Sequence, residues 1–337
     1  MSNLVSILIP ACNAEKWIAD TIRSAVSQDW QRKEVIIVDD GSTDGTLSVA
    51  RSFESKFVKV VTQENRGASA ARNRALSFAQ GTYIQFLDAD DLLAPDKISQ
   101  QLKQKDHGPD SLTLLSAAWG RFLSCPGRAK FKPDSLWQDL DPIEWILRKF
   151  IDNKFMMNAA WLVSRKLAEV AGPWDERLSM DDDGEYACRL VARSQAVKFV
   201  SEAKCYYRVG NQGSQSWMRS DKALNSLFLS ICLSTEHLRS LEDSDRTRIA
   251  CLKYLNDNFE LFYPESPQLI NNAYDLARNL GGELALPVER FRFAILQNIF
   301  GRKNAKKGRQ TYNQSKIFVL KIWERLLHKL NKSCKFE

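Results

Sequence analysis

The sequence predicts an α/β fold in which helices flank a mostly parallel sheet, followed by a helical C-terminal region. Three observations predict it. Short apolar runs alternate with helical patterns in the first part of the chain, two of these runs end in clustered aspartates, and apolar residues beyond about residue 220 recur only at helical spacing. This alternation favours right-handed crossovers between parallel strands.

Four apolar runs predict the first strands of the sheet. They are residues 4–9, 34–38, 57–62 and 83–87. Apolar or small residues at helical spacing separate them and predict helices at 15–30, 43–53 and 67–76. The run at 83–87 is apolar on both faces, which is typical of a strand buried in a parallel sheet.

The later elements follow from the same periods. Strands are predicted at 112–119, 155–164, 196–200 and 204–209, and helices at 142–151, 165–171 and 185–193. Helical spacing then recurs at 224–231, 249–259, 269–280 and 291–299. We therefore predict a domain at 1–220 with halves at 1–105 and 106–220, a helical region at 221–312 and a basic tail at 313–337.

Composition and charge narrow the class of protein. The chain has 337 residues, 44% hydrophobic content and a net charge of +7. Residues 301–337 hold eleven Lys and Arg against two acids, which leaves residues 1–300 at −2. A nearly neutral body argues against nucleic-acid binding. Seven scattered cysteines, no apolar stretch of about 18 residues and no leader predict a cytoplasmic protein with reduced thiols.

The tail carries an amphipathic pattern. Between residues 315 and 332, apolar side chains including Trp323 fall on one side and four Lys or Arg mostly on the other. Such a helix lies on an anionic membrane, where each cation contributes around 1 kcal/mol, or docks on its own domain. Both alternatives stay open, and the first predicts peripheral contact with the inner face of the plasma membrane.

Three carboxylates follow the strand at 83–87. Asp88, Asp90 and Asp91 sit where ligands bind in an open α/β sheet, and carboxylates one residue apart suit Mg²⁺ or Mn²⁺. The sequence therefore predicts a site for a metal and a phosphate. The alternative is a turn in which Asp91 caps a helix. A second acidic strand end, Asp39-Asp40, offers Asp40 as an acceptor for a nucleobase or ribose, or as part of a capped turn.

Four segments then carry a family resemblance. Residues 5–13, 38–44, 65–73 and 87–91 resemble, in order and spacing, the motifs of the family 2 inverting glycosyltransferases. The resemblance covers about two thirds of the chain. It implies the Rossmann-like GT-A fold, a nucleoside-diphosphate sugar donor with UDP as the expected nucleotide, and a divalent metal, Mg²⁺ or Mn²⁺.

The resemblance also implies roles for individual residues. Those assigned to the donor nucleotide are Pro10, Asn13, Asp40, Arg72 and Asp88. Asp40 would contact the base, Asp88 the ribose or metal, and Asp90 the metal. Arg72 would face the diphosphate, or else pair with an acid at the surface. The family usually places an aromatic residue two positions after the proline, where this chain has Cys12.

A second acidic cluster, Asp181 to Asp183, follows a Gly-Pro-Trp-Asp-Glu turn and resembles the segment that carries the catalytic base. The family's usual Glu-Asp pair is Asp182-Asp183 here, so the matching base is Asp183, with Asp182 as the other catalytic candidate and Glu185 as a weaker one. A carboxylate against an attacking hydroxyl supplies general-base catalysis, and adjacent aspartates raise at least one pKa. The alternative is an acidic helix N-terminus that favours the helix dipole.

The segment from Arg208 to Ser216 resembles a flexible segment that closes over the donor. Arg208 and Ser214 would then contact the diphosphate, and the alternative is a polar surface loop. Residues 124–140 are rich in Pro, Gly and basic residues without clear periodicity. We expect a loop on the acceptor side there.

The resulting hypothesis is a metal-dependent inverting transfer of a sugar from a nucleoside diphosphate to the hydroxyl of a saccharide or lipid-linked acceptor, in cell-envelope or extracellular polysaccharide synthesis. One alternative is a non-catalytic nucleotide-sugar-binding module, which Cys12 and the altered Asp182-Asp183 pair favour. A weaker one is a sugar nucleotidyltransferase, whose Gly-rich phosphate loop is missing after the first strand.

Overall fold

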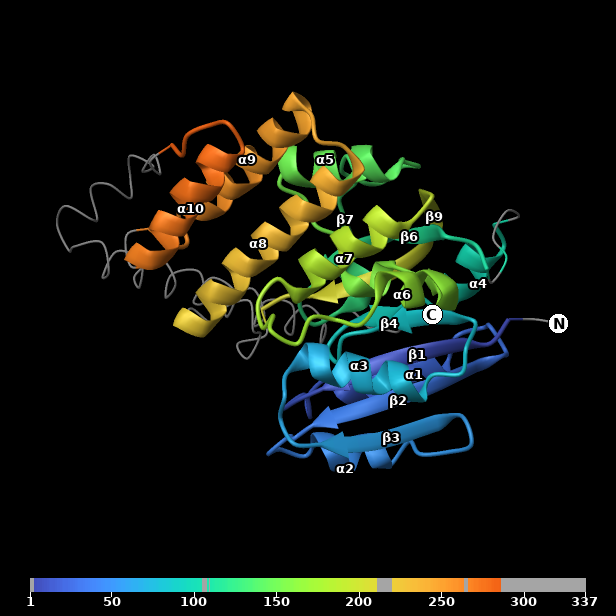
Figure 1. The fold of residues 1–337 in the computed structure, drawn as a ribbon. Helices are drawn as coiled ribbons and strands as arrows, with labels where there is room; N and C mark the ends of the chain where they lie inside the picture. Colours follow the sequence, from blue (N-terminus) through green and yellow to red (C-terminus); the bar gives the residue numbers. More distant parts are fainter. Residues whose placement is uncertain (1–2, 105–107, 109, 211–219, 264–265, 286–337) are drawn as a thin grey trace.

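The computed structural model describes residues 3–104, 108, 110–210, 220–263 and 266–285 (Figure 1). Its first sheet has the strand order β3-β2-β1-β4-β8. The strands are β1 (Val5–Ala11), β2 (Lys33–Asp40), β3 (Val58–Gln63), β4 (Tyr83–Phe86) and β8 (Val163–Ser164). The first four run parallel and β8 runs antiparallel to β4. The predicted α/β fold with a mostly parallel sheet is confirmed.

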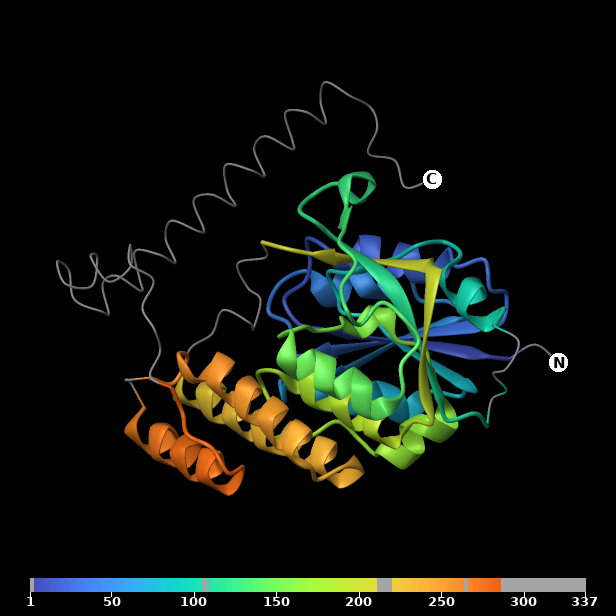
Figure 2. The same cartoon turned by 90° about the horizontal axis from the view of Figure 1, so that it is seen from above.

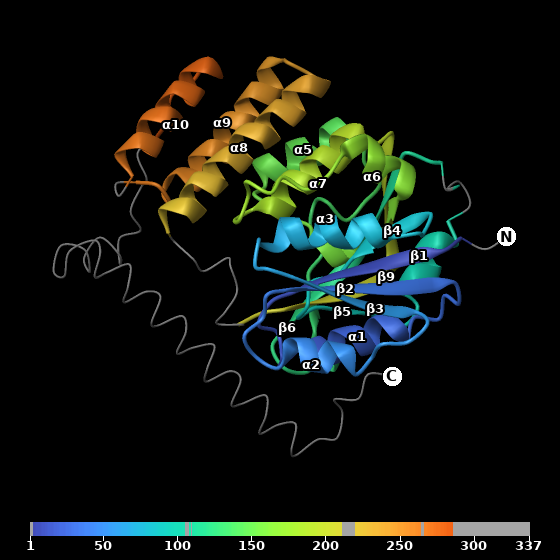
Figure 3. The same cartoon turned by 60° about the horizontal axis from the view of Figure 1, so that its bottom comes forward.

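Helices cover both faces of this sheet. Helices α1 (Ile18–Val26) and α2 (Thr46–Arg51) lie on one face, and α3 (Ala68–Phe78) lies on the other (Figure 3). Helix α1 buries Ile18, Ile22 and Ala25 at helical spacing. Gly67 precedes α3 with a φ of 94°, a conformation that glycine adopts without steric cost. The chain can therefore turn sharply into α3 at the edge where the strands end.

The second sheet has the order β5-β9-β6-β7. Its strands are β5 (Leu92–Leu93), β6 (Thr113–Phe122), β7 (Lys130–Phe131) and β9 (Ala196–Arg208), and α4 (Lys97–Leu102) follows β5. Strands β6 and β9 run parallel, with a register shift at Ala117/Ala118. The separate strands predicted at 196–200 and 204–209 are therefore one strand, because a bulge absorbs the polar interruption between them.

A helical layer extends from the first sheet. It contains α5 (Pro142–Ile151), α6 (Arg165–Ala171) and α7 (Asp182–Arg193), and then α8 (Asp221–Leu241), α9 (Asp245–Phe259) and α10 (Pro267–Asn279) (Figure 2). Helix α8 packs along α7, and α9 packs against α5. One hydrophobic core includes strand residues together with Ile231, Leu255 and Phe259. The core is thus continuous across residue 220, and the domain division proposed there stays a prediction.

Some predicted elements differ from the structure. The strand predicted at 155–164 is wrong, because the stretch forms a 3-10 turn at Asn158–Ala160 and only then the two-residue strand β8. The helix expected from residue 43 begins at Thr46, after Gly45. Asp91 caps no helix, since Leu92 and Leu93 form β5. In the helical pattern predicted at 249–259, Leu255 and Phe259 of α9 are buried, but Ile249 is 66% exposed.

Five described cysteines carry free thiols, whereas Cys125 is disulfide-bonded, so the prediction of reduced thiols is wrong at that position. None of the helices in the described ranges combines the length and apolar character needed to cross a bilayer. The helix predicted at 291–299, the basic tail at 313–337 and Ser214 lie outside the described residues.

Candidate active site

A cleft of about 720 Å³ opens at the carboxyl ends of β1, β2 and β4. The fold brings nine predicted site residues into its lining from segments far apart in the sequence. They are Pro10, Asn13, Asp40, Arg72, Asp88, Asp90, Asp182, Asp183 and Arg208. The helical region contributes three more lining residues: Leu227 of α8, Asn258 of α9, and Leu261, which follows α9. These three were missed from the sequence, because they belong to no motif and come from the helical region.

The loops after β1 and β2 are tied to each other. Asn13, with a φ of 50°, accepts a hydrogen bond at Oδ1 from the Thr43 backbone N–H at 2.8 Å. Its own N–H donates to Ser42 Oγ at 3.0 Å. Cys12 is exposed in the cleft, where Asn65 Nδ2 donates to its Sγ at 3.3 Å. The position where the family usually carries an aromatic ring is therefore small and polar here.

Asp40 is buried and already serves as a protein acceptor. Its Oδ1 accepts from Gln63 Nε2 at 2.7 Å and from the Arg66 N–H at 2.8 Å, and its Oδ2 accepts from the Gly67 N–H at 2.8 Å. Asp40 therefore holds the turn that leads into α3. Its contact with a base stays a prediction.

The preceding residue, Asp39, lies deeper in the protein. Asp39 is 2% exposed, and its Oδ1 has no hydrogen-bond partner among the described residues. Its Oδ2 accepts only a long bond of 3.3 Å from the Ser42 N–H. A buried carboxylate oxygen without a donor is costly, and Asp39 is not among the residues that line the cleft.

Arg72 connects the two acidic clusters. Its Nη2 donates to Asp88 Oδ1 at 2.7 Å and its Nη1 to Asp182 Oδ2 at 2.6 Å. The guanidinium also lies 4.4 Å from the ring centre of Trp174. The side chain is only 6% exposed, so the predicted pairing with an acid is confirmed, but the pair is buried and not at the surface. The charges of Asp88 and Asp182 raise the pKa of Arg72 against the effect of burial.

The turn that carries Trp174 is held by α3. Asn73 Oδ1 accepts from the Trp174 N–H at 2.8 Å, and Asn73 Nδ2 donates to the Trp174 carbonyl at 2.9 Å. Trp174 then stacks on Tyr186 of α7 with ring centres 4.0 Å apart. The Gly-Pro-Trp-Asp-Glu turn thus supplies a rigid aromatic support for Arg72.

The carboxylates after β4 lie in different surroundings. Asp88 Oδ2 accepts from Asn158 Nδ2 at 3.2 Å, in addition to its pair with Arg72. Asp91 is 1% exposed and accepts from the Arg208 N–H at 2.9 Å. Burial, followed by the charges of Asp90 and Asp88, raises the pKa of Asp91 well above its usual value. Three carboxyl groups therefore meet at one strand end, and Asp91 is the one whose neutral form burial favours.

Oxygen donors at this strand end fit a divalent ion. Within the described ranges, no group of three or more His, Cys, Asp or Glu side chains is arranged to hold a metal by itself. Mg²⁺ commonly binds through one or two carboxylates together with substrate phosphates and water. Asp90, which lines the cleft, and Asp88 supply such carboxylates.

Arg208 lies at the end of β9. Its Nε donates to the Asp90 carbonyl at 2.8 Å, and its guanidinium lies 4.5 Å from the ring centres of both Trp17 and Phe122. Arg208 as a whole is 6% exposed, and burial lowers the pKa of its guanidinium. Arg208 is therefore a fixed part of the cleft wall and does not belong to a surface loop.

Asp183 has the electrostatics of a general base. Burial, followed by the charges of Asp182 and Asp181, raises the pKa of Asp183 to about 7. This confirms that the acidic cluster raises at least one pKa. Its Oδ1 accepts the N–H of Gly184 at 2.9 Å. Asp182 is occupied differently, since its Oδ2 accepts from Arg72 and from Ser69 Oγ at 3.3 Å.

The third aspartate of the cluster is held by the helical region. Asp181 has a φ of 58°, and its Oδ2 accepts from Ser230 Oγ at 2.6 Å and from the Tyr254 hydroxyl at 3.2 Å. Lys149 Nζ lies 3.5 Å from that hydroxyl. Helices α8 and α9 therefore determine where α7 begins, and with it the position of Asp183.

Glu185 is unsuited to act as a base. Its carboxylate is 2% exposed and binds Arg189 through bonds of 2.8 and 2.9 Å and His237 Nε2 at 2.9 Å. These hydrogen bonds lower its pKa despite burial. Glu185 thus joins α7 to α8.

Comparison with known proteins decides the family. Residues 6–169 match the model described as Glycosyl transferase family 2. This segment belongs to that family. Relatives of this chain include the "Putative teichuronic acid biosynthesis glycosyltransferase TuaG" of Bacillus subtilis, 45% identical over 103 residues, 30% of this chain and 41% of that protein. The "UDP-Glc:alpha-D-GlcNAc-diphosphoundecaprenol beta-1,3-glucosyltransferase WfaP" of Escherichia coli is 43% identical over 29% of this chain and 40% of its own. The match spans about two fifths of these curated relatives.

Solved structures extend the likeness beyond the matched segment. S. aureus TarS in complex with UDP-GlcNAc superimposes with a TM-score of 0.65 at 19% identity, over 81% of this chain and 80% of that one. The mannosyltransferase PcManGT of Pyrobaculum calidifontis, in complex with GDP-Man and Mn²⁺, gives a TM-score of 0.53 at 19% identity over 96% and 87%. At such identities the likeness shows the fold alone, and the predicted GT-A fold of this chain is confirmed.

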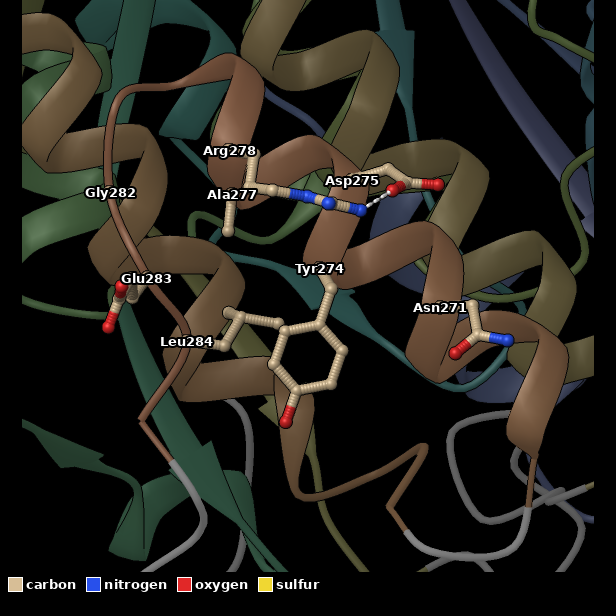
Figure 4. Close-up of a pocket in the computed structure, with 8 residues that line it drawn as sticks. All are labelled: Asn271, Tyr274, Asp275, Ala277, Arg278, Gly282, Glu283 and Leu284. Carbon is tan, nitrogen blue, oxygen red and sulfur yellow. Dashed lines mark hydrogen bonds and ion pairs between the residues drawn. The ribbon is translucent and has the colours of Figure 1, made fainter.

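A separate hollow of about 680 Å³ lies beside α10 (Figure 4). Tyr274 and Leu284 point toward each other across it, and Arg278 pairs with Asp275 along the helix. That ion pair is exposed and the wall holds no cluster of acids. The cleft, and not this hollow, is therefore the candidate active site.

Proposed function

We propose that this chain is a metal-dependent inverting glycosyltransferase that moves a sugar from a UDP-sugar to an acceptor hydroxyl. The observation that carries the proposal is Asp183, a carboxyl with a pKa of about 7 in the same cleft as the carboxylates after β4. Family membership supports the reaction class. UDP as the nucleotide is supported by the names of WfaP and of the TarS complexes.

The donor would lie along the ends of β1 and β2. Pro10, Asn13 and Cys12 line this part of the cleft, and Asp40 holds the turn beside it. Asp40, which lines the cleft, is the carboxylate that would contact the base there.

The diphosphate would face the end of β4. Asp90, with Asp88, would hold Mg²⁺ or Mn²⁺ there, and the ion when bound would offset the negative charge of the departing diphosphate. Arg208 lies beside Asp90 and adds a fixed positive charge to the same wall. Arg72 acts through Asp88, because its guanidinium is already taken by two carboxylates.

Asp183 would accept the proton of the acceptor hydroxyl as that oxygen attacks the anomeric carbon. A base with a pKa near the working pH combines a useful deprotonated fraction with a strong pull on the proton. Asp182 is less suited, because Arg72 and Ser69 occupy its Oδ2. Attack from the side opposite the diphosphate would invert the configuration at that carbon.

We therefore expect Asp183→Asn to lower turnover about 10²- to 10⁴-fold, because the amide cannot accept the proton. Affinity for UDP should stay unchanged, since donor binding uses the other wall of the cleft. The measurement is UDP release with acceptor present, together with calorimetric titration of UDP. Asp275→Asn on α10, an exposed carboxylate, is the matched control. Turnover within threefold of wild type would show that the base is another residue.

The non-catalytic alternative predicts UDP-sugar binding without product. Cys12 is the observation that favours it, because a thiol offers a base less stacking area than a ring. The same assay separates the two, since any transferred sugar excludes it. We place the reaction at the cytoplasmic side of the envelope, in polysaccharide synthesis, with a saccharide or lipid-linked acceptor.

A further inference from the structure

A second hollow continues from the cleft along the end of β9. It has a volume of about 590 Å³ and lies against β6, the β6–β7 hairpin and the segment after α5. The hairpin projects from the body of the molecule (Figure 2). Phe155 lines both this hollow and the cleft, and Val209 in its wall directly follows Arg208 of the cleft. We call this second hollow the basic groove.

The charge of the basic groove is strongly one-sided. Five cationic side chains line it against the single acid Asp134. They are Arg121, Arg128, Lys130, Lys132 and Lys154. In the described ranges none of the five forms an ion pair, whereas several other surface arginines do, such as Arg66 with Glu176 and Arg246 with Glu242. A concave wall with uncompensated positive charge concentrates anions.

An aromatic cluster separates the basic groove from the acids. Trp119 and Phe155 have ring centres 4.8 Å apart, and Tyr207 lies 6.0 and 5.9 Å from them. Arg121 lies over both rings of the groove, 5.3 Å from Trp119 and 5.6 Å from Phe155. Such rings present rigid apolar area, with a negative face, to the C–H groups of a sugar.

Tyr207 also connects this cluster to the catalytic acids. It lines the cleft, and burial followed by the charges of Asp91 and Asp183 raises the pKa of its hydroxyl. A saccharide on the aromatic cluster would therefore have one end toward Asp183 and the other toward the five cations.

We propose that the basic groove is the acceptor subsite and that it takes a saccharide carrying phosphate. The sugar would pack on Trp119 and Phe155, and its phosphate would lie among Arg128, Lys130 and Lys132. This inference rests on the proposed function, because it names the acceptor of the same transfer. The phosphate could belong to a lipid diphosphate or to a phosphodiester polymer, and the test uses both.

The test compares the variant Arg128→Ala/Lys130→Ala/Lys132→Ala with Lys103→Ala/Lys166→Ala, which removes exposed cations elsewhere. The probes are GlcNAc linked through diphosphate to a decyl chain, the decyl glycoside of GlcNAc without phosphate, and a glycerol-phosphate oligomer that carries GlcNAc. Binding is measured by titration calorimetry without donor, and KM and kcat are measured with UDP-sugars.

For the phosphate-bearing probe that binds, we expect the groove variant to raise Kd and KM about tenfold, with kcat and UDP affinity unchanged. The uncharged glycoside should bind to wild type and groove variant with equal affinity. Added salt should weaken binding of the charged probe by wild type more than by the variant. Groove-dependent binding of either the lipid diphosphate or the polymer would support the inference, and the probe that binds would identify the source of the phosphate.

Three results would overturn the inference. One is equal binding of phosphate-bearing probes by wild type and groove variant, or no binding by either. Another is an equal loss in the Lys103/Lys166 control. The third is a defect confined to phosphatidylglycerol vesicles, which would make the groove a membrane contact. Binding that depends on the groove without any sugar transfer would instead overturn the proposed function and leave the phosphate site in place.

Discussion

At the scale of single residues, three adjacent aspartates carry three different tasks. Asp181 binds the helical region, Asp182 binds Arg72, and Asp183 keeps a carboxyl of raised pKa in the cleft. The difference comes from their partners, because each protein donor favours the charged form of the carboxylate that it contacts. Side-chain spacing alone does not distinguish the three.

The pKa of Asp183 predicts a pH profile. Only the deprotonated carboxylate accepts a proton, so kcat/KM should rise about tenfold per pH unit below pH 7 and level off above it. The sign follows from the raised pKa, which keeps the acid protonated through the mildly acidic range. Initial rates between pH 5 and 9 check it, with UDP binding across the same range as the control. A profile that is level down to pH 5 would contradict the assignment.

At the scale of elements, α8 and α9 belong to the active site. Ser230 and Tyr254 hold Asp181 immediately before α7, and Leu227 lines the cleft. Gly184 lies so close to Asp181 that a Cβ at residue 184 would stand 2.1 Å from Asp181 Oδ1. The start of α7 is therefore fixed from both sides.

Removing the hydroxyl of Tyr254 tests this arrangement. Tyr254→Phe leaves Asp181 and the buried Lys149 each without one partner, so we expect the free energy of unfolding to fall by about 1–3 kcal/mol. Turnover should fall as well, while UDP affinity stays constant, because only the base side shifts. Urea denaturation and steady-state kinetics measure these effects. Tyr263→Phe, on the segment after α9, is the comparison; an equal loss of turnover there would show that the effect is not specific to Asp181.

The elements show what the sequence could predict. The bounds of α5 and α6, at 142–151 and 165–171, agree with the helical spacing because each has a clear cap, Asp141 and Ser164. The stretch at 155–164 was mispredicted as a strand because its apolar residues are buried by tertiary packing and not by strand pairing. Short apolar runs do not distinguish these cases.

The candidate site was predictable to the same extent. Motif spacing correctly predicted nine residues that line one cleft, because parallel strands end at one edge. The sequence could not show that Arg72 is shared between Asp88 and Asp182, or that Asp39 Oδ1 has no donor among the described residues. The two contacts of Arg72 join residues 16 and 110 positions apart, and patterns of neighbouring residues do not predict such contacts.

At the scale of the whole molecule, the cleft, the basic groove and the helical layer make one continuous body. The core runs from the first sheet into α8, α9 and α10. A ligand that binds only this folded body raises its unfolding temperature, and saturation at 100 times Kd adds about 2.7 kcal/mol. Ligand panels therefore report on the site without a known acceptor.

We expect UDP with Mn²⁺ to raise the melting temperature by several degrees, and UDP with chelator to raise it much less. Asp90→Asn should lose the metal-dependent part, because it removes a carboxylate from the proposed ion site. Differential scanning fluorimetry with UDP, GDP, ADP and CDP, each with Mn²⁺ or with chelator, measures both the preference for a nucleobase and the dependence on metal. Asp20→Asn, an exposed acid on α1, serves as the comparison. An equal shift for all four nucleotides, or one indifferent to chelator, would contradict the proposed donor site.

Arg72 has one more consequence, for how this site could change in evolution. Its single positive charge is shared between one acid on the donor side and one on the base side, so loss of Arg72 leaves two carboxylates without their cation, whereas loss of either acid leaves one ion pair. Of the three positions, Arg72 is therefore the one at which we expect substitution to be tolerated least. Libraries that seek a new sugar specificity should hold Arg72 and its two acids constant and diversify the walls around them.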